Sequence, residues 1–103
     1  MALAYPQYIA KKHTADKAAA VSGAVIIYAV QILGGSAATT VQLVDALTDT
    51  SSDELMYAAV INDSILFDYS HLGGVAFSTG LTVDIQTTGG AVIIWTSVAQ
   101  ATA

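Results

Sequence analysis

The chain has 103 residues, of which 54% are hydrophobic and 11% are charged, and its formal net charge is −5. An ordinary soluble domain is about 25% charged, so this chain has too few charges to cover a monomer, and we expect it to associate with other chains. It contains no cysteine, which excludes disulfides and thiolate metal sites. The length suits one domain with a hydrophobic core of its own.

The charges are divided between two parts of the chain. The three basic residues all precede Ala18: Lys11, Lys12 and Lys17. Every acidic residue except Asp16 follows Ala18. An acidic body repels phosphate, which argues against direct binding of nucleic acid. The basic segment suits an acidic neighbour, and a second copy of the chain is one such neighbour.

Residues 1–17 are predicted to form an extended basic N-terminal arm, and residues 18–103 the folded domain. Pro6 interrupts any regular element in the arm. We expect the arm to dock on a partner and to contact it through Tyr5, Tyr8, Ile9, Lys11 and Lys12. Removal of Met1–Lys12 should then leave the fold intact and abolish binding. The alternative interpretation is a frayed terminus.

The run Ala18–Leu33 is almost wholly apolar, so a signal peptide or a membrane helix has to be considered. The run is shorter than the roughly 20 residues that a membrane-spanning helix needs. Its second half is rich in valine, isoleucine and tyrosine, which favour strands. We therefore predict a strand, with a helix as the alternative. Both faces of Ala24–Val30 are apolar, which predicts a subunit contact on the outer face; Ile27, facing core or partner, is a candidate partner-binding residue.

The rest of the body reads as short strands separated by turns. Thr39–Val44, Leu55–Ile61 and Ile65–Tyr69 are predicted strands, and Asp45–Glu54 is a polar loop. Apolar and polar residues alternate between positions 81 and 86: Leu81, Val83 and Ile85 with Thr82, Asp84 and Gln86. This period of two indicates a strand with one face exposed to solvent. Glycines at 73–74, 80 and 89–90 mark turns, and the last of these predicts a β-hairpin with Ala91–Val98.

About seven strands at spacings of roughly 8–12 residues are typical of a β-sandwich or barrel. The predicted fold class is all-β: a small antiparallel β-sandwich, jelly-roll-like, with the extended N-terminal arm.

No pattern of catalytic or metal-ligating residues is found. Asp68, Ser70 and His71 are adjacent in one loop, where they are expected to hydrogen-bond the backbone rather than to form a triad. His13 and His71 are too few for a zinc site. Trp95 is expected in the core, although an exposed Trp95, Tyr57 or Tyr69 in a groove would suit a sugar. We therefore predict no enzyme activity, no cofactor and no metal.

The segment from Ile65 to Trp95 resembles a pattern found in small bacteriophage virion proteins. The matching phrases are G-V-A-F-S-T-G-L-T-V-D-I at 74–85 and T-G-G-A-V-I-I-W at 88–95, which together cover about the last third of the chain. The resemblance implies a β-sandwich of the decoration, cement or head-fibre type, and it carries no catalytic residues.

The resemblance leads to the expectation of a capsid decoration or cement protein that binds the major capsid protein on the outer surface of a phage shell. Such a protein would occupy the host cytoplasm before assembly, without contact with nucleic acid or membrane. Trimers are the first expectation for its homo-oligomer, because closed symmetry covers apolar faces. The alternative is a receptor- or glycan-binding module of a head fibre or tail.

Overall fold

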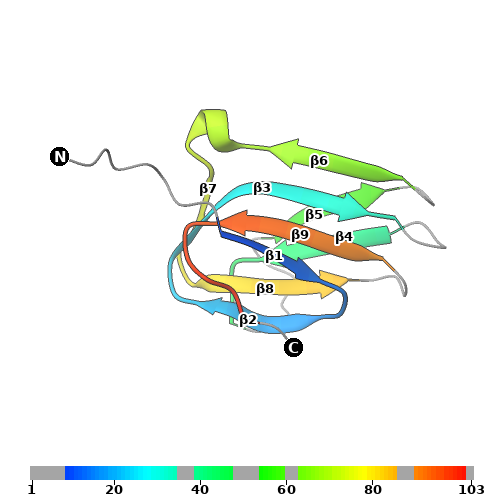
Figure 1. The fold of residues 1–103 in the computed structure, drawn as a ribbon. Coiled ribbons are helices and arrows are strands. Elements are labelled where there is room, and N and C mark those ends of the chain that lie inside the picture. Colours follow the sequence, from blue (N-terminus) through cyan, green and yellow to red (C-terminus); the bar gives the residue numbers. More distant parts are fainter. Residues whose placement is uncertain (1–8, 35–38, 48–53, 60–62, 86–89, 102–103) are drawn as a thin grey trace.

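Two antiparallel sheets packed face to face make up the protein (Figure 1). The computed structural model describes residues 9–34, 39–47, 54–59, 63–85 and 90–101, and the side chains of 54–59 are outside the description. The strands are β1 (Ile9–His13), β2 (Lys17–Ser22), β3 (Val25–Leu33), β4 (Thr39–Val44), β5 (Glu54–Ala59), β6 (Ser64–Asp68), β7 (Val75–Phe77), β8 (Gly80–Ile85) and β9 (Ala91–Thr96).

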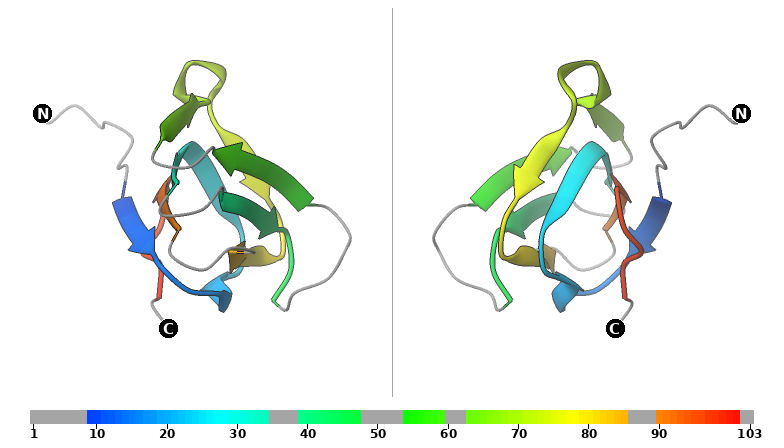
Figure 2. Two further views of the ribbon diagram at one scale, coloured as in Figure 1. Left: turned by 90° about the vertical axis from the view of Figure 1, so that its right-hand side faces the viewer. Right: turned by 90° about the vertical axis from the view of Figure 1, so that its left-hand side faces the viewer.

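The strand order is that of a jelly roll. Sheet A has the order β1-β9-β3-β6, with β7 pairing beside β6 on the same edge of β3, and sheet B has the order β2-β8-β4-β5. The pairs therefore nest: β1 with β9, β2 with β8, β3 with β6 and β7, and β4 with β5. In the turned views of Figure 2 the two sheets face each other across the core. The predicted all-β sandwich of jelly-roll type is confirmed.

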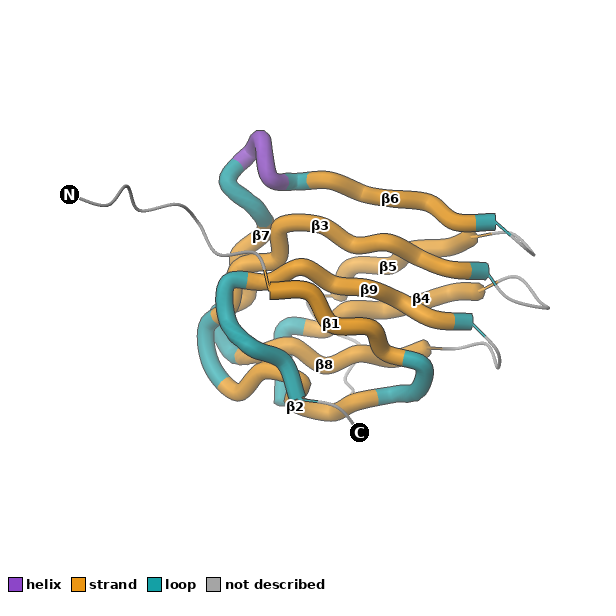
Figure 3. Tube along the Cα trace, in the orientation of Figure 1, coloured by secondary structure: helices purple, strands orange, loops and turns teal. Residues whose placement is uncertain are grey.

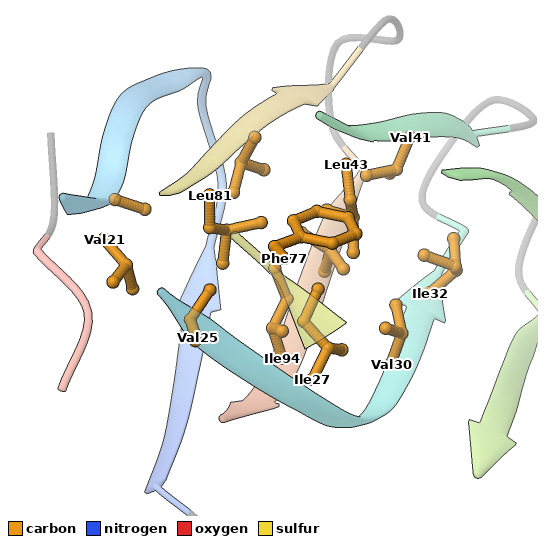
Figure 4. Close-up of a cluster of buried hydrophobic side chains, with 13 residues drawn as sticks. Val21, Val25, Ile27, Val30, Ile32, Val41, Leu43, Phe77, Leu81 and Ile94 are labelled. Carbon is orange, nitrogen blue, oxygen red and sulfur yellow. The ribbon is translucent and has the colours of Figure 1, made fainter. Parts of the chain in front are cut away.

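Alternate side chains of the strands fill the space between the sheets (Figure 4). In β4 the period of two places Val41 and Leu43 inside, as the sequence predicts. Ile27 on β3 also points into this core and has no exposed surface. A partner therefore cannot contact Ile27 directly, and the residue stabilises the sandwich rather than an interface.

The apolar run Ala18–Leu33 is extended, as predicted, but it forms two strands. Gly23, with a φ of 118°, separates β2 in sheet B from β3 in sheet A. Glycine adopts this conformation without the Cβ clash that other residues would meet. Within the described part of the chain, no helix is long and apolar enough to cross a membrane.

The predicted hairpin between Gly80–Gln86 and Ala91–Val98 is wrong. β8 belongs to sheet B and β9 to sheet A, so the chain crosses from one sheet to the other between them. Both strands carry apolar residues that face the core. These residues are buried equally well whether the two strands pair side by side in one sheet or face each other across the sandwich, so the apolar pattern could not distinguish the two arrangements. Gly90 is buried at this crossing, where a Cβ would collide with the side chain of Thr39.

The predicted wet face of β8 is also wrong at Thr82, whose exposed fraction is 1%. Its hydroxyl accepts a hydrogen bond from the Ala19 amide at 3.1 Å and donates one to the Ala46 carbonyl at 3.0 Å. A buried hydroxyl is tolerated when both its donor and its acceptor capacity are used. Leu81 and Val83 face the core as predicted, and Ile85 packs against it.

Candidate interaction surface

The outer face of sheet A carries the side chains that alternate with the core residues. We define this outer face by the exposed or half-buried side chains of four neighbouring strands: Ala10 and Lys12 on β1, Ile93 and Trp95 on β9, Tyr28, Ala29, Gln31 and Leu33 on β3, and Leu66 and Asp68 on β6. Most of these side chains are apolar. The expectation that β3 is apolar on both sides holds for its neighbour β9 as well, whereas the outward side of β6 carries Leu66 between the polar Ser64 and Asp68.

The strand register arranges this face in two rows that cross the sheet. One row runs Ala10, Trp95, Ala29, Asp68, and the next runs Lys12, Ile93, Gln31, Leu66. Side chains opposite one another on paired strands lie about 5 Å apart. The apolar residues at the centre of both rows therefore form one continuous surface, with a lysine at one edge and an aspartate at the other.

A β-bulge in β3 shapes the middle of the outer face. Ile27 pairs with Thr96 and Ala29 pairs with Trp95, so Tyr28 is an extra residue in the ladder. A bulge of this kind re-aims side chains and increases the local twist. As a result, Tyr28 and Ala29 both line the same depression, next to Trp95.

This depression is an open pocket of about 180 Å³ lined by Tyr28, Ala29, Leu66, Asp68, Ser70 and Trp95. Its walls are apolar and aromatic, and its rim carries one carboxylate and one hydroxyl. Leu66 lies on the edge strand β6 and is 57% exposed, which leaves apolar surface uncovered at the pocket.

Asp68 is held in place at the rim by the residue two positions later. Its Oδ1 accepts hydrogen bonds from the Ser70 amide at 2.9 Å and from the Ser70 hydroxyl at 2.7 Å. These two hydrogen bonds lower the pKa of Asp68 below its ordinary value, and the bond from the Ser70 hydroxyl has the larger effect. The pocket therefore presents a fixed negative charge at neutral pH.

The loop after β6 makes one helical turn, Ser70–Leu72, before β7 (Figure 3). It ends at Gly73 and Gly74, whose φ values of 83° and 90° confirm the predicted turn. Asp68 accepts a hydrogen bond from the backbone amide of Ser70, which agrees with the predicted hydrogen bonding to the loop backbone, and His71 is exposed. Asp45, in the predicted acidic loop, accepts hydrogen bonds from the amides of Ser78, Thr79 and Gly80, so it anchors the turn before β8.

The residues predicted to bind a partner are not all brought together. Ile9, Lys11 and Lys12 lie on β1, which pairs with β9 as an edge strand of sheet A, and Lys12 is the exposed member of the three. Tyr5 and Tyr8 lie outside the described residues. Ile27 is in the core. Residues 9–13 are therefore part of the sandwich rather than of an arm outside it.

Leu66 and Asp68 were not predicted to belong to an interaction surface, whereas Tyr28 lies in the run Ala24–Val30 whose outer face was predicted to contact a subunit. The prediction that Trp95 lies in the core is wrong, and its exposure was considered only for the alternative of sugar binding. Val92 and Ile94 are the core residues of β9, so Ile93 and Trp95 face outward. The available signal was that both alternating sets of this strand are apolar. That pattern is typical of a strand that is covered on both faces.

Among the described residues, no group of three or more histidine, aspartate or glutamate side chains could hold a metal ion. Comparison with protein-family models, with curated proteins and with solved structures found no match to this chain.

Proposed function

We propose that the protein is a structural component of a bacteriophage particle, a decoration or cement protein that binds the outside of the capsid shell. The observation that supports this proposal best is the apolar outer face of sheet A, where Leu66 is 57% exposed and Trp95 lines an open pocket. A single folded domain rarely leaves such a face uncovered unless it binds another protein. The jelly roll and the virion-like phrases at 74–85 and 88–95 are consistent with this role.

The proposed action is mechanical. Copies associate with one another and with the major capsid protein, and each contact covers apolar area across a joint of the shell. Burial of apolar surface contributes roughly 25 cal/mol per Å². Because a shell offers many equivalent sites, modest contacts repeated over the particle add up to resistance against internal pressure. Homo-oligomers, trimers first, are the proposed binding unit.

The test is binding of the purified protein to undecorated shells, followed by sedimentation and quantification of the bound protein. A chain that lacks residues 1–8 should keep the fold, because β1 begins at Ile9, and should lose most of its binding if the arm contacts the shell. The full chain should saturate the shells at a fixed ratio. If the full chain ignores the shells at every concentration, the proposed role is wrong.

A second candidate function, a receptor- or glycan-binding module, is favoured by one observation. Trp95 and Tyr28 line an open pocket beside the fixed carboxylate of Asp68. Aromatic rings stack on the apolar side of a sugar, and a carboxylate accepts hydrogen bonds from the sugar hydroxyl groups. Trp95 is the one tryptophan of the chain, so a titration with monosaccharides and host surface glycans, read by its fluorescence, tests this candidate directly.

A further inference from the structure

The two edge strands of sheet A carry opposite charges on the outer face. Lys12 on β1 and Asp68 on β6 are both exposed, and β9 and β3 lie between them. The side chains in between are apolar or neutral, with Ile93 and Trp95 at the centre. A surface with one charge at each edge and an apolar centre is complementary to a copy of itself.

The pocket at the Asp68 edge has the chemistry that receives a lysine side chain. Apolar walls from Ala29 and Leu66 suit the methylene stem, since lysine lays its stem on apolar surface. The rings of Tyr28 and Trp95 attract a cation, and the carboxylate of Asp68 can accept hydrogen bonds from an ammonium group.

A lysine in this pocket has to come from another molecule. Positions 18–103 contain neither lysine nor arginine, and the chain has three basic residues in all. Of these, Lys11 and Lys17 are half-buried and Lys12 is exposed. Lys12 is three strand spacings from β6, about 14 Å, whereas a lysine side chain extends roughly 6 Å. Lys12 therefore cannot reach the pocket of its own chain.

We propose that the outer face of sheet A binds a second copy of this chain, with Lys12 of one copy entering the pocket of the other at Asp68. This inference deepens the proposed function by naming the surface through which copies associate. It rests on the part of that function in which copies associate with one another, and it does not depend on binding to a shell.

A dimer with two-fold symmetry can form this contact. A two-fold axis parallel to the strands lays β1 of one copy over β6 of the other, so that both Lys12–Asp68 contacts form at once. Lys12 stands in the row of Leu66, and Asp68 is two residues further along β6. That offset is about 7 Å, which the length of the lysine side chain largely covers.

Charge exchange tests the proposal. Lys12→Glu and Asp68→Lys should each weaken self-association by at least about tenfold, because each places like charges together. The double variant, which exchanges the two charges, should recover most of the loss. Both residues are exposed, so the sandwich should be retained, although Asp68→Lys also removes the two hydrogen bonds from Ser70. Circular dichroism checks the fold of each variant. Sedimentation equilibrium at low and moderate salt gives the association constant and the number of copies.

Matched controls change charge elsewhere. Lys17→Glu on β2 and Asp63→Lys, before β6, alter the net charge by the same amounts and do not lie on the outer face as defined above. Leu66→Lys is a second test, since it puts a positive charge beside the incoming Lys12 and should also weaken association. Trp95 fluorescence should shift to shorter wavelength on association as water leaves the pocket.

Three outcomes would overturn the proposal. They are a monomer at all concentrations, an oligomer that Lys12→Glu and Asp68→Lys weaken no more than the controls do, and a double variant that is no tighter than the single ones. If the protein is monomeric and Trp95 responds to a sugar, the pocket belongs to a carbohydrate. Self-association that follows the expected pattern without shell binding would leave this inference standing and contradict the proposed function alone.

Discussion

His13 is a buried side chain with a specific hydrogen-bonding arrangement. It is 3% exposed, and its Nε2 lies 2.8 Å from Oε1 of Gln100. The Nε2 of Gln100 donates to the Ile94 carbonyl and to the Thr96 hydroxyl, so its Oε1 is the acceptor for the ring. The proton of the neutral imidazole is therefore on Nε2. This network ties the C-terminal segment to β1 and β9.

The pH dependence of stability follows from this burial. Loss of hydration on burial, reinforced by the charge of Lys11, lowers the pKa of His13 below its ordinary value of 6.5, although the bond to Gln100 opposes the shift. The unfolded chain then binds a proton more readily than the folded one. The contribution of His13 is therefore complete above about pH 6.5 and is lost as the pH falls below that value.

Urea unfolding between pH 8 and pH 5 measures this effect. The free energy of unfolding should decline below about pH 6.5 in the natural chain and decline less in His13→Gln. His71→Gln is the control, because His71 is exposed on the turn after β6. An equal decline in His13→Gln and the natural chain would show that burial of His13 does not govern the slope.

Gly90 illustrates how closely the two sheets approach where β9 begins. A Cβ at this position would collide with the side chain of Thr39, which is fully buried. Gly90→Ala should therefore lower the free energy of unfolding by about 1–3 kcal/mol. The double variant with Thr39→Ala should lose less free energy of unfolding than the two single variants lose in sum, since removing the threonine side chain makes room for the new Cβ. Strict additivity would indicate that the clash is not the cause.

At the scale of elements, β1 changes the expectation for the N-terminal arm. Residues 9–13 pair with β9 along their whole length, so removal of residues 1–12 takes away most of an edge strand. This deletion should lower Tm by at least about 10 °C, given roughly 4–8 °C per kcal/mol in a domain of this size. Removal of residues 1–8 should change Tm little. Equal Tm values by circular dichroism would show that β1 contributes nothing to stability.

The strands could be predicted from the sequence where their two faces differ. Thr39–Val44 is such a case, because Val41 and Leu43 alternate with polar residues and the structure gives the same bounds. In β9 both alternating sets are apolar, so periodicity could not decide whether Ile94 or Trp95 faces the core. The pairing of strands could not be predicted either, since the pattern of a strand does not say whether the next strand pairs beside it or lies in the other sheet.

The pocket could not be predicted because it depends on register. Its residues come from β3, β6 and β9 and from the turn after β6, and they meet only once the three strands are aligned. The bulge at Tyr28 shifts that alignment by one residue. The basic character of the N-terminal segment was visible in the sequence, but its position on an edge strand of the sandwich was not.

At the scale of the whole molecule, the last strand completes the fold. β9 lies between β1 and β3 in sheet A (Figure 1), so the first strand has no neighbour in the sheet until the last one docks. Every pairing of the nested jelly roll except β4 with β5 joins strands that are not consecutive. Closing such long loops costs conformational entropy before the contacts form.

Refolding should therefore be slow, with a relaxation time of milliseconds to seconds at 25 °C, as for other β-proteins with mostly non-local pairing. Trp95 lies on β9 and is the one tryptophan, so its fluorescence after dilution from urea reports the docking of the final strand. Stopped-flow traces by fluorescence and by far-ultraviolet circular dichroism should coincide, because β9 joins β1 to the β3–β6 part of sheet A and the sheet is incomplete until it docks. A sub-millisecond fluorescence change with native amplitude, or a circular dichroism signal that recovers well before it, would mean that β9 does not control assembly of the sandwich.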